Sequence, residues 1–107
     1  MTAAIYARVS TRDKGQTNDN QPLELRAFAE RLGYTVYQEY CDQESGSTAE
    51  RPAFQRLFVD AHQRRFDVLL FWSLDRFSRE GVGETLNHLQ RLNVAGVRFK
   101  SFTEQYL

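Results

Sequence analysis

The sequence predicts a single α/β domain, built on a mostly parallel four-stranded sheet with helices on both faces. The chain has 107 residues, 41% of them hydrophobic, which suffices for one compact core and is too short for two ordinary domains. Segments with the hydrophobic periodicity of strands alternate with segments that have the periodicity of helices. The resulting order, βαβαβαβ, is typical of parallel sheets whose strands are joined by helical crossovers.

Four segments have the pattern of strands: residues 3–9, 34–40, 68–72 and 97–102. The first and third are the most uniformly apolar, as strands buried on both faces are, so we place them in the centre of the sheet. The second and fourth carry charges and alternate, so we place them at the edges. This gives the strand order 2-1-3-4, the flavodoxin-like pattern, in which the ligand crevice lies beyond the carboxyl ends of strands 1 and 3.

Three segments between the strands have apolar residues at helical spacing. The first begins near Pro22 and ends near Gly33, with the stripe Leu25, Phe28, Ala29 and Leu32. The second is opened by Pro52, with the stripe Phe54, Leu57, Phe58 and Ala61. The third ends near Gly96, with the stripe Val82, Leu86, Leu89 and Leu92. Proline is favoured in the first turn of a helix and glycine just after its last turn.

The composition narrows the classes of function. Lys+Arg and Asp+Glu number 14 each, so the formal net charge is zero and only local arginine clusters could bind nucleic acid. Cys41 is the one cysteine, which excludes an internal disulfide and a thiolate metal cluster within this chain. The N-terminus does not resemble a signal peptide, and the longest apolar run, residues 68–72, is too short to cross a membrane. We therefore expect a cytoplasmic protein without membrane contacts.

Polar residues gather at the ends of the two central strands. They are Arg8, Ser10 and Arg12 at the first strand, and Asp75, Arg76 and Arg79 in the stretch "SLDRFSR" after the third. Neighbouring parallel strands end at the same edge of a sheet, so the two groups should meet in one crevice. Arg76 and Arg79 share a face if their turn is helical, and Asp75 could hold one guanidinium in place. Several guanidinium groups around a serine suit a phosphate, to which they make bidentate hydrogen bonds.

A serine hydroxyl is a weak nucleophile and ordinarily needs an adjacent base. His62 and His88 both fall within predicted helices, far from Ser10 in sequence, so a histidine triad is not expected. Phosphoryl transfer can instead proceed by positioning and by electrostatic stabilisation of the transition state, which arginines supply.

Each fragment also has a simpler interpretation. Arg8 alone is typical of a strand end that reaches solvent, and Ser10 alone is typical of a turn or cap. An Asp–Arg pair at a strand exit contributes little to stability. Arg51, just before Pro52, is either a surface charge at a helix start or a group that reaches the crevice from its loop. The joint placement of the fragments at one switch point favours the phosphate site.

Two other functions remain open at this point. Asp42 and Glu44 lie just past the second predicted strand and could form a magnesium site with Asp75 in a metal-dependent phosphotransfer or nuclease domain. A solvated acidic loop is the simpler interpretation of these carboxylates. The same fold could also serve as a non-catalytic phosphate-binding module, in which replacing Ser10 would change nothing measurable.

Five stretches resemble the catalytic domains of serine recombinases, the family of resolvases, DNA invertases and large integrases. They are "YARVST" from Tyr6, "NDNQ" ending at Gln21, "DQESGST" from Asp42, "ERP" around Arg51 and "SLDRFSR" from Ser73. They occur in the family's order and cover essentially the whole chain. The combination of "YARVS" with "LDRxxR" some sixty residues later is far more specific than either piece.

The resemblance implies a role for each matching residue. Ser10 would attack a DNA phosphodiester and form a 5′-phosphoserine link with a free 3′-hydroxyl. The residues around the scissile phosphate would be Arg8, Arg51, Arg76 and Arg79. Asp75 and Gln21 would orient these groups, and Asp42 would support the site. The resemblance implies neither a metal nor a nucleotide cofactor.

The resemblance also implies partners. Double-stranded DNA would be the substrate, and the full-length protein would form a homodimer or tetramer. Family members continue with a long helix for oligomerisation and a separate DNA-binding region. We therefore expect residues 1–107 to be a catalytic domain without those parts, one that binds DNA weakly and does not recombine it alone.

Overall fold

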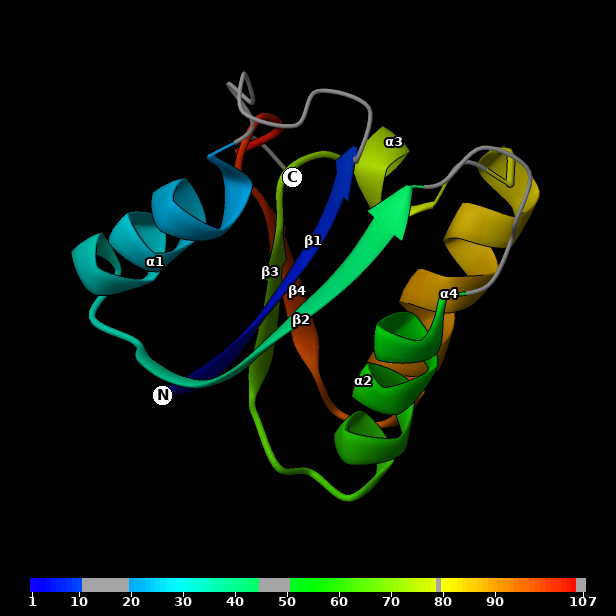
Figure 1. Cartoon of the computed structure of the whole chain (residues 1–107). Helices are drawn as coiled ribbons and strands as arrows, with labels where there is room; N and C mark the ends of the chain where they lie inside the picture. Colours follow the sequence, from blue (N-terminus) through cyan, green and yellow to red (C-terminus); the bar gives the residue numbers. More distant parts are fainter. Residues whose placement is uncertain (11–19, 45–50, 79, 106–107) are drawn as a thin grey trace.

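The computed structural model describes residues 1–10, 20–44, 51–78 and 80–105, with the backbone alone at Ser10 and Glu44. In chain order the elements are β1 (Thr2–Ser10), α1 (Gln21–Arg31), β2 (Thr35–Glu44), α2 (Pro52–His62), β3 (Val68–Phe71), α3 (Leu74–Phe77), α4 (Val82–Val94) and β4 (Arg98–Ser101). Figure 1 shows these elements along the chain. None of the helices in the described ranges is long and apolar enough to cross a membrane.

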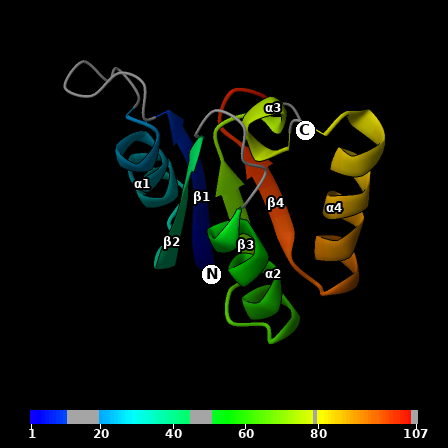
Figure 2. The same ribbon diagram turned by 45° about the vertical axis from the view of Figure 1, so that its right-hand side comes forward.

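The strands form one parallel sheet in the order β2-β1-β3-β4, which confirms the predicted order. Figures 1 and 2 show α1 on one face of this sheet and α2 and α4 on the other. The prediction of an α/β domain with helices on both faces is therefore confirmed. β1 and β3 lie in the centre, as their apolar sequences indicated.

β1 contributes to two hydrophobic cores because successive residues of a strand point to opposite faces. Ala4 and Tyr6 belong to the core on the α2 and α4 side. Ala3 and Ile5 belong to the core on the α1 side, together with Leu25 of α1. All of these side chains are at most 1% exposed. The strand is therefore held firmly on both faces up to the point where its polar end begins.

β2 is longer than the sequence predicted, since it continues through residues 41–44. The prediction that Asp42 and Glu44 lie in a loop beyond this strand is wrong. Asp42 pairs in register with Arg8 of β1, and Glu44 pairs with Ser10. Continued pairing with the long central strand outweighs the low intrinsic strand propensity of these polar residues.

The buried face of α4 also differs from the predicted stripe. Thr85, His88 and Leu92 are its buried residues, whereas Val82 is 77% exposed and Leu86 is 59% exposed. The helix is rotated in this way because the His88 ring packs edge-on against Phe54 of α2, with ring centroids 4.9 Å apart. A polar side chain thus occupies a core position that the apolar pattern assigned to leucine.

The ends of α1 agree with the prediction except at Leu32. The helix ends at Arg31, and Gly33 follows with a φ of 78°, the left-handed conformation that glycine favours after a helix. Leu32 is the C-cap and is 39% exposed, so it does not belong to the buried stripe.

Candidate active site

The polar end of β1 lies at the carboxyl edge of the sheet. β3 ends at Phe71, which pairs with Tyr6, so the last residues of β1 extend past β3. The space beyond β3 is taken by α3, a one-turn helix (Figure 1). Ser73 begins this helix as its N-cap, and its Oγ accepts a hydrogen bond from the Arg76 backbone nitrogen at 3.1 Å. This cap fixes the turn that carries Asp75 and Arg76, and the turn is helical.

Two of the predicted site residues meet at the backbone of a third. Nη1 of Arg76 donates a hydrogen bond to the carbonyl oxygen of Arg8 at 3.0 Å. Nε2 of Gln21 donates to the same oxygen at 3.2 Å. Gln21 is 1% exposed and comes from the first turn of α1. The structure therefore brings together Arg8, Gln21 and Arg76 two residues before Ser10.

The Nε–H group of Arg8 is an unusual hydrogen-bond donor. Its Nε atom is buried and has no hydrogen-bond partner within the part of the chain that the structure describes. A buried donor without an acceptor costs about 1–3 kcal/mol, so such groups are rare in folded proteins. An arginine in this condition at a strand end is suited to an anionic ligand that supplies the missing acceptor.

Asp42 is buried at 4% exposure and caps a helix from a distance. Its Oδ1 accepts from the Ala53 backbone nitrogen at 2.9 Å, and its Oδ2 accepts from that of Phe54 at 3.0 Å. Oδ2 also accepts from the Tyr6 hydroxyl at 3.0 Å. The residue at the N-cap of α2, Arg51, provides no side-chain cap, so a carboxylate from β2 satisfies the free N–H groups of that helix.

These contacts bear on the magnesium site considered above. Both oxygens of Asp42 are engaged inside the protein, whereas Asp75 is exposed on α3. The carboxylate of Asp42 accepts hydrogen bonds within the protein and lies in β2, so the acidic-loop interpretation of this residue is wrong and a magnesium site there is disfavoured.

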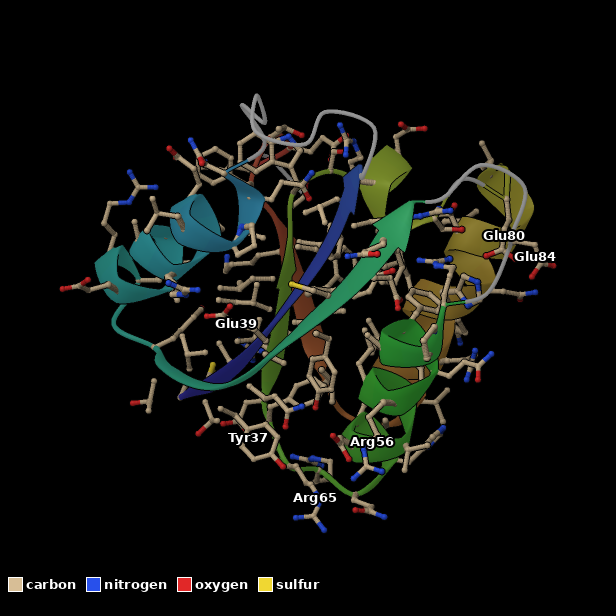
Figure 3. All side chains as sticks on the ribbon, in the orientation of Figure 1. Tyr37, Glu39, Arg56, Arg65, Glu80 and Glu84 are labelled. Atoms are coloured by element: carbon tan, nitrogen blue, oxygen red, sulfur yellow. The ribbon has the colours of Figure 1, made fainter. Side chains whose placement is uncertain are left out.

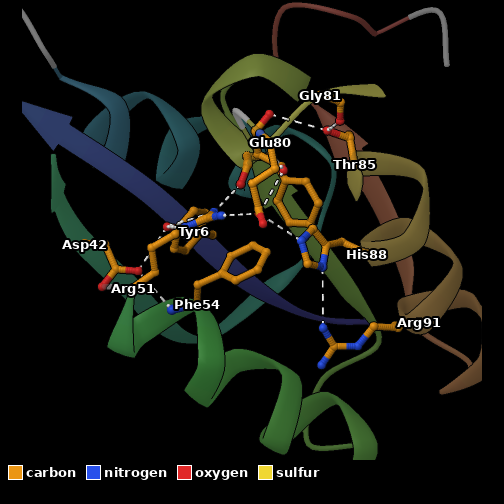
Figure 4. Close-up of polar contacts among 11 residues, drawn as sticks. Tyr6, Asp42, Arg51, Phe54, Glu80, Gly81, Thr85, His88 and Arg91 are labelled. Atoms are coloured by element: carbon orange, nitrogen blue, oxygen red, sulfur yellow. Dashed lines mark hydrogen bonds and ion pairs between the residues drawn. The ribbon is translucent and has the colours of Figure 1, made fainter. Parts of the chain in front are cut away.

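Arg51 is also buried, with 8% exposure, and points into the protein (Figure 4). Its Nε and Nη2 atoms each donate to the Tyr6 hydroxyl at 3.3 Å, and Nη2 also donates to the carbonyl of Phe77. Nη1 donates to Oε1 of Glu80 at 3.3 Å. The guanidinium carbon lies 3.5 Å from the ring centroid of Phe54, a cation–π contact. The interpretation of Arg51 as a surface charge is therefore wrong.

The buried phenol of Tyr6 joins Asp42 to Arg51. Burial raises the pKa of Tyr6, and Arg51 only partly opposes this effect. The hydroxyl therefore keeps its proton, donates it to Asp42 and accepts from Arg51. Tyr6 lies two residues before Arg8 on β1, so the Arg51 cluster adjoins the polar strand end.

Glu80 and His88 complete this cluster and were not identified as site residues from the sequence. Oε1 of Glu80 accepts from Ser78 Oγ at 3.2 Å and lies 3.0 Å from Nε2 of His88. Nδ1 of His88 lies 3.4 Å from Nη1 of Arg91, on the far side of the ring (Figure 4). A histidine within an otherwise apolar helix face, eight residues after a glutamate, is the only sequence signal for this pair.

The pKa of Glu80 is lowered, chiefly by its hydrogen bond to His88, with Ser78 and Arg51 acting in the same direction. A carboxylate with a lowered pKa stabilises the fold above the pKa that it has when unfolded, near 4.5. That contribution is lost as the pH falls through the lower pKa of the folded state.

We predict that Glu80→Gln is less stable than the parent at pH 7 and that this difference shrinks below pH 4.5. Urea unfolding of both proteins between pH 3 and pH 7 checks this, and a constant difference across the range would contradict it.

One group of side chains could reach a single metal ion. Among the residues that the structure describes, ligand atoms of Glu80, Glu84 and His88 lie within 4.8 Å of one another. Arg51 already donates to Glu80, however, and its positive charge opposes a cation at this point. We interpret the group as part of an ion-pair network.

Some predicted site residues lie outside the described part of the chain. These are Arg12, Arg79 and the side chains of Ser10 and Glu44. Of the remaining residues, Arg8, Gln21 and Arg76 form one group, Asp42 and Arg51 form the neighbouring group around Tyr6, and Asp75 is exposed on α3.

The comparison with family models gives one match across nearly the whole chain. The model described as "Resolvase, N terminal domain" matches residues 3–107. A curated protein of Bacillus subtilis (strain 168), named as a DNA recombinase, is 29% identical over 94 residues. The present chain spans 19% of the length of that relative, and the match covers 85% of the chain.

Solved structures of similar proteins share the fold. The N-terminal catalytic domain of TP901-1 integrase is 37% identical, with a TM-score of 0.82, and the match covers 98% of this chain and 79% of that one. The C-terminal catalytic domain of ISC1926 TnpA, an IS607-like serine recombinase, is 30% identical, with a TM-score of 0.81 and coverages of 94% and 69%. A resolvase family site-specific recombinase from Streptococcus pneumoniae is 25% identical, with a TM-score of 0.85 and coverages of 98% and 74%.

Proposed function

Since this chain belongs to the resolvase family of serine recombinase catalytic domains, we propose that it cleaves and rejoins DNA by transesterification at Ser10. The observation that carries this proposal is the arginine group at the end of β1. Arg76 and Gln21 converge on the Arg8 carbonyl, and the buried Nε of Arg8 lacks an acceptor among the described residues. A phosphodiester oxygen would supply that acceptor two residues from the nucleophile.

The proposed reaction has two balanced steps. In the first, the Ser10 oxygen attacks phosphorus, the new Ser–O–P bond forms, and the bond to the 3′-oxygen breaks. The proton of the serine hydroxyl leaves to solvent, and the departing 3′-oxygen gains one. In the second step, a 3′-hydroxyl attacks the phosphoserine and releases Ser10. Each step exchanges one phosphate ester for another, so the linkage is conserved without a nucleotide cofactor.

The arginines stabilise the negative charge that develops on the phosphoryl oxygens. We assign Arg8 and Arg76 to this role from their position, and Arg79 from its place in the "LDRxxR" motif. Asp75 and Gln21 are assigned to orient these groups. Arg51 is assigned as a further phosphate ligand, supported by Asp42 through the shared Tyr6 hydroxyl.

Double-stranded DNA is the partner that this chemistry requires. Recombination of two sites breaks four strands, and each serine can hold one strand end. We therefore propose that the working enzyme is a homo-oligomer that brings four copies of Ser10 to two DNA sites. Residues 1–107 would serve as its catalytic domain.

Trapping the covalent intermediate tests the proposal. A tagged protein carrying this chain is expressed in the source organism, the cells are lysed in denaturant, and DNA that remains on the tag is sequenced. After digestion with nuclease and trypsin, mass spectrometry should find a nucleotide remnant on the peptide "VSTR", with fragmentation placing it on Ser10.

The recovered DNA then distinguishes this function from a metal-dependent nuclease. Purified protein should form the adduct on that DNA in excess chelator, because no metal takes part in the proposed steps. Cleavage that needs a divalent cation and leaves no protein on the DNA would refute the recombinase assignment. The engagement of both Asp42 oxygens already disfavours a metal site at that residue.

A further inference from the structure

Every side-chain nitrogen of Arg51 is occupied by an acceptor from the protein itself. Three acceptors surround the guanidinium: the Tyr6 hydroxyl, the Phe77 carbonyl and the Glu80 carboxylate. Of these three, Glu80 alone carries a negative charge. A phosphate that approached Arg51 in this arrangement would have to compete with an anion already in place.

The contact with Glu80 is also the most easily detached of the three. Tyr6 and Phe77 are at most 1% exposed and belong to the core, so their oxygens are fixed by packing. The Glu80 side chain is 49% exposed and could turn into solvent without opening the core. His88 and Ser78 hold its Oε1 toward Arg51 in the meantime.

A carboxylate and a phosphate bind to arginine in the same way. Both are anionic acceptors that a guanidinium can bind through two parallel N–H groups. The Glu80 carboxylate therefore already accepts from Nη1 of Arg51, a donor that a phosphate oxygen could use. Exchange of one anion for the other would preserve the charge pairing of Arg51 throughout.

We propose that Glu80 is a positioning residue that holds Arg51 in a withdrawn position and must release it before Arg51 can bind phosphate. This inference rests on the proposed function, in which Arg51 contributes to the phosphate site. His88 and Ser78 take part indirectly because they orient Glu80. Removing the negative charge at position 80 should make Arg51 available and strengthen phosphate binding.

The experiment compares two charge-removing variants in the 15N-labelled chain. Glu80→Gln removes the charge that contacts Arg51. Glu84→Gln is the matched control, because Glu84 is exposed and lies beside Glu80 at the start of α4 (Figure 3). The Nε–H signal of Arg51, assigned with Arg51→Lys, is followed without ligand and during titration with inorganic phosphate.

Without ligand, we expect the Nε–H signal of Arg51 to shift and to exchange faster with water in Glu80→Gln but not in Glu84→Gln. During the titration, phosphate should bind Glu80→Gln about 3- to 5-fold more tightly than the parent, the effect of a partly exposed ion pair worth up to ~1 kcal/mol. Glu80→Asp keeps the charge and should restore most of the parent behaviour.

The outcomes separate the two proposals. If Glu80→Gln behaves as Glu84→Gln does in both measurements, Glu80 does not hold Arg51 and the inference is overturned. If phosphate leaves the Arg8 and Arg76 signals unmoved in every protein, the phosphate site itself is refuted. The ligand-free Arg51 signal still reports on the Glu80 contact in that case.

Discussion

Replacing Arg8 by methionine is expected to lower the yield of covalent protein–DNA adduct by about 100-fold or more without lowering the stability of the fold. Methionine keeps an unbranched side chain but has no donor for a phosphate. It also removes the buried Nε that lacks an acceptor among the described residues. Loss of this donor should leave the unfolding temperature unchanged or higher, because a buried donor without an acceptor destabilises the folded state. A residue that is kept for function can carry such a cost in stability.

The measurements are adduct yield on the recovered DNA and thermal unfolding followed by circular dichroism. Ser10→Ala lacks the proposed nucleophile and gives the background level of the adduct assay. Arg98→Met is the matched control, since Arg98 is an exposed arginine at the start of β4, away from the carboxyl edge. A variant of Arg8 that unfolds several degrees earlier but still forms adduct would show that Arg8 has a structural role and no part in phosphate binding.

Asp42→Asn should cause the largest loss of stability that we predict. The carboxylate accepts hydrogen bonds from Tyr6, Ala53 and Phe54, and an asparagine would turn one NH2 group toward these donors. Disrupting such a buried, charge-assisted network costs about 2–4 kcal/mol. For a domain of this size that corresponds to a fall of about 10–20 °C in Tm.

Urea unfolding followed by circular dichroism and Trp72 fluorescence measures this loss. Glu84→Gln makes the same chemical change at an exposed site and should shift the free energy of unfolding by less than about 0.5 kcal/mol. Equal effects of the two substitutions would mean that the contacts of Asp42 with α2 and Tyr6 contribute nothing to stability.

The sheet could be predicted because its signals are local. The central strands show uniform apolar runs, and Pro22 and Pro52 lie in the first turns of α1 and α2, which carry apolar stripes. The meeting of Arg8 with Arg76 followed from the strand order alone, since that order puts both residues at one edge. Pattern and topology together were sufficient for this half of the site.

The cluster around Arg51 could not be predicted in the same way, because its members depend on tertiary contacts. The sequence pattern placed Asp42 in a polar loop, whereas in the structure β2 continues along β1 through this residue. The apolar pattern did not assign His88 to the core, where its ring packs against Phe54. Once that ring is buried, α4 must turn Val82 and Leu86 outward, which apolar periodicity cannot foresee.

The carbonyl of Arg8 is held by donors from two layers of the molecule. Gln21 reaches it from α1 on one side of the sheet, and Arg76 reaches it from α3, which packs with the opposite core. A single backbone oxygen thus connects the two layers through hydrogen bonds. A displacement of either helix would strain one of these hydrogen bonds two residues before Ser10, the residue that we propose as the nucleophile.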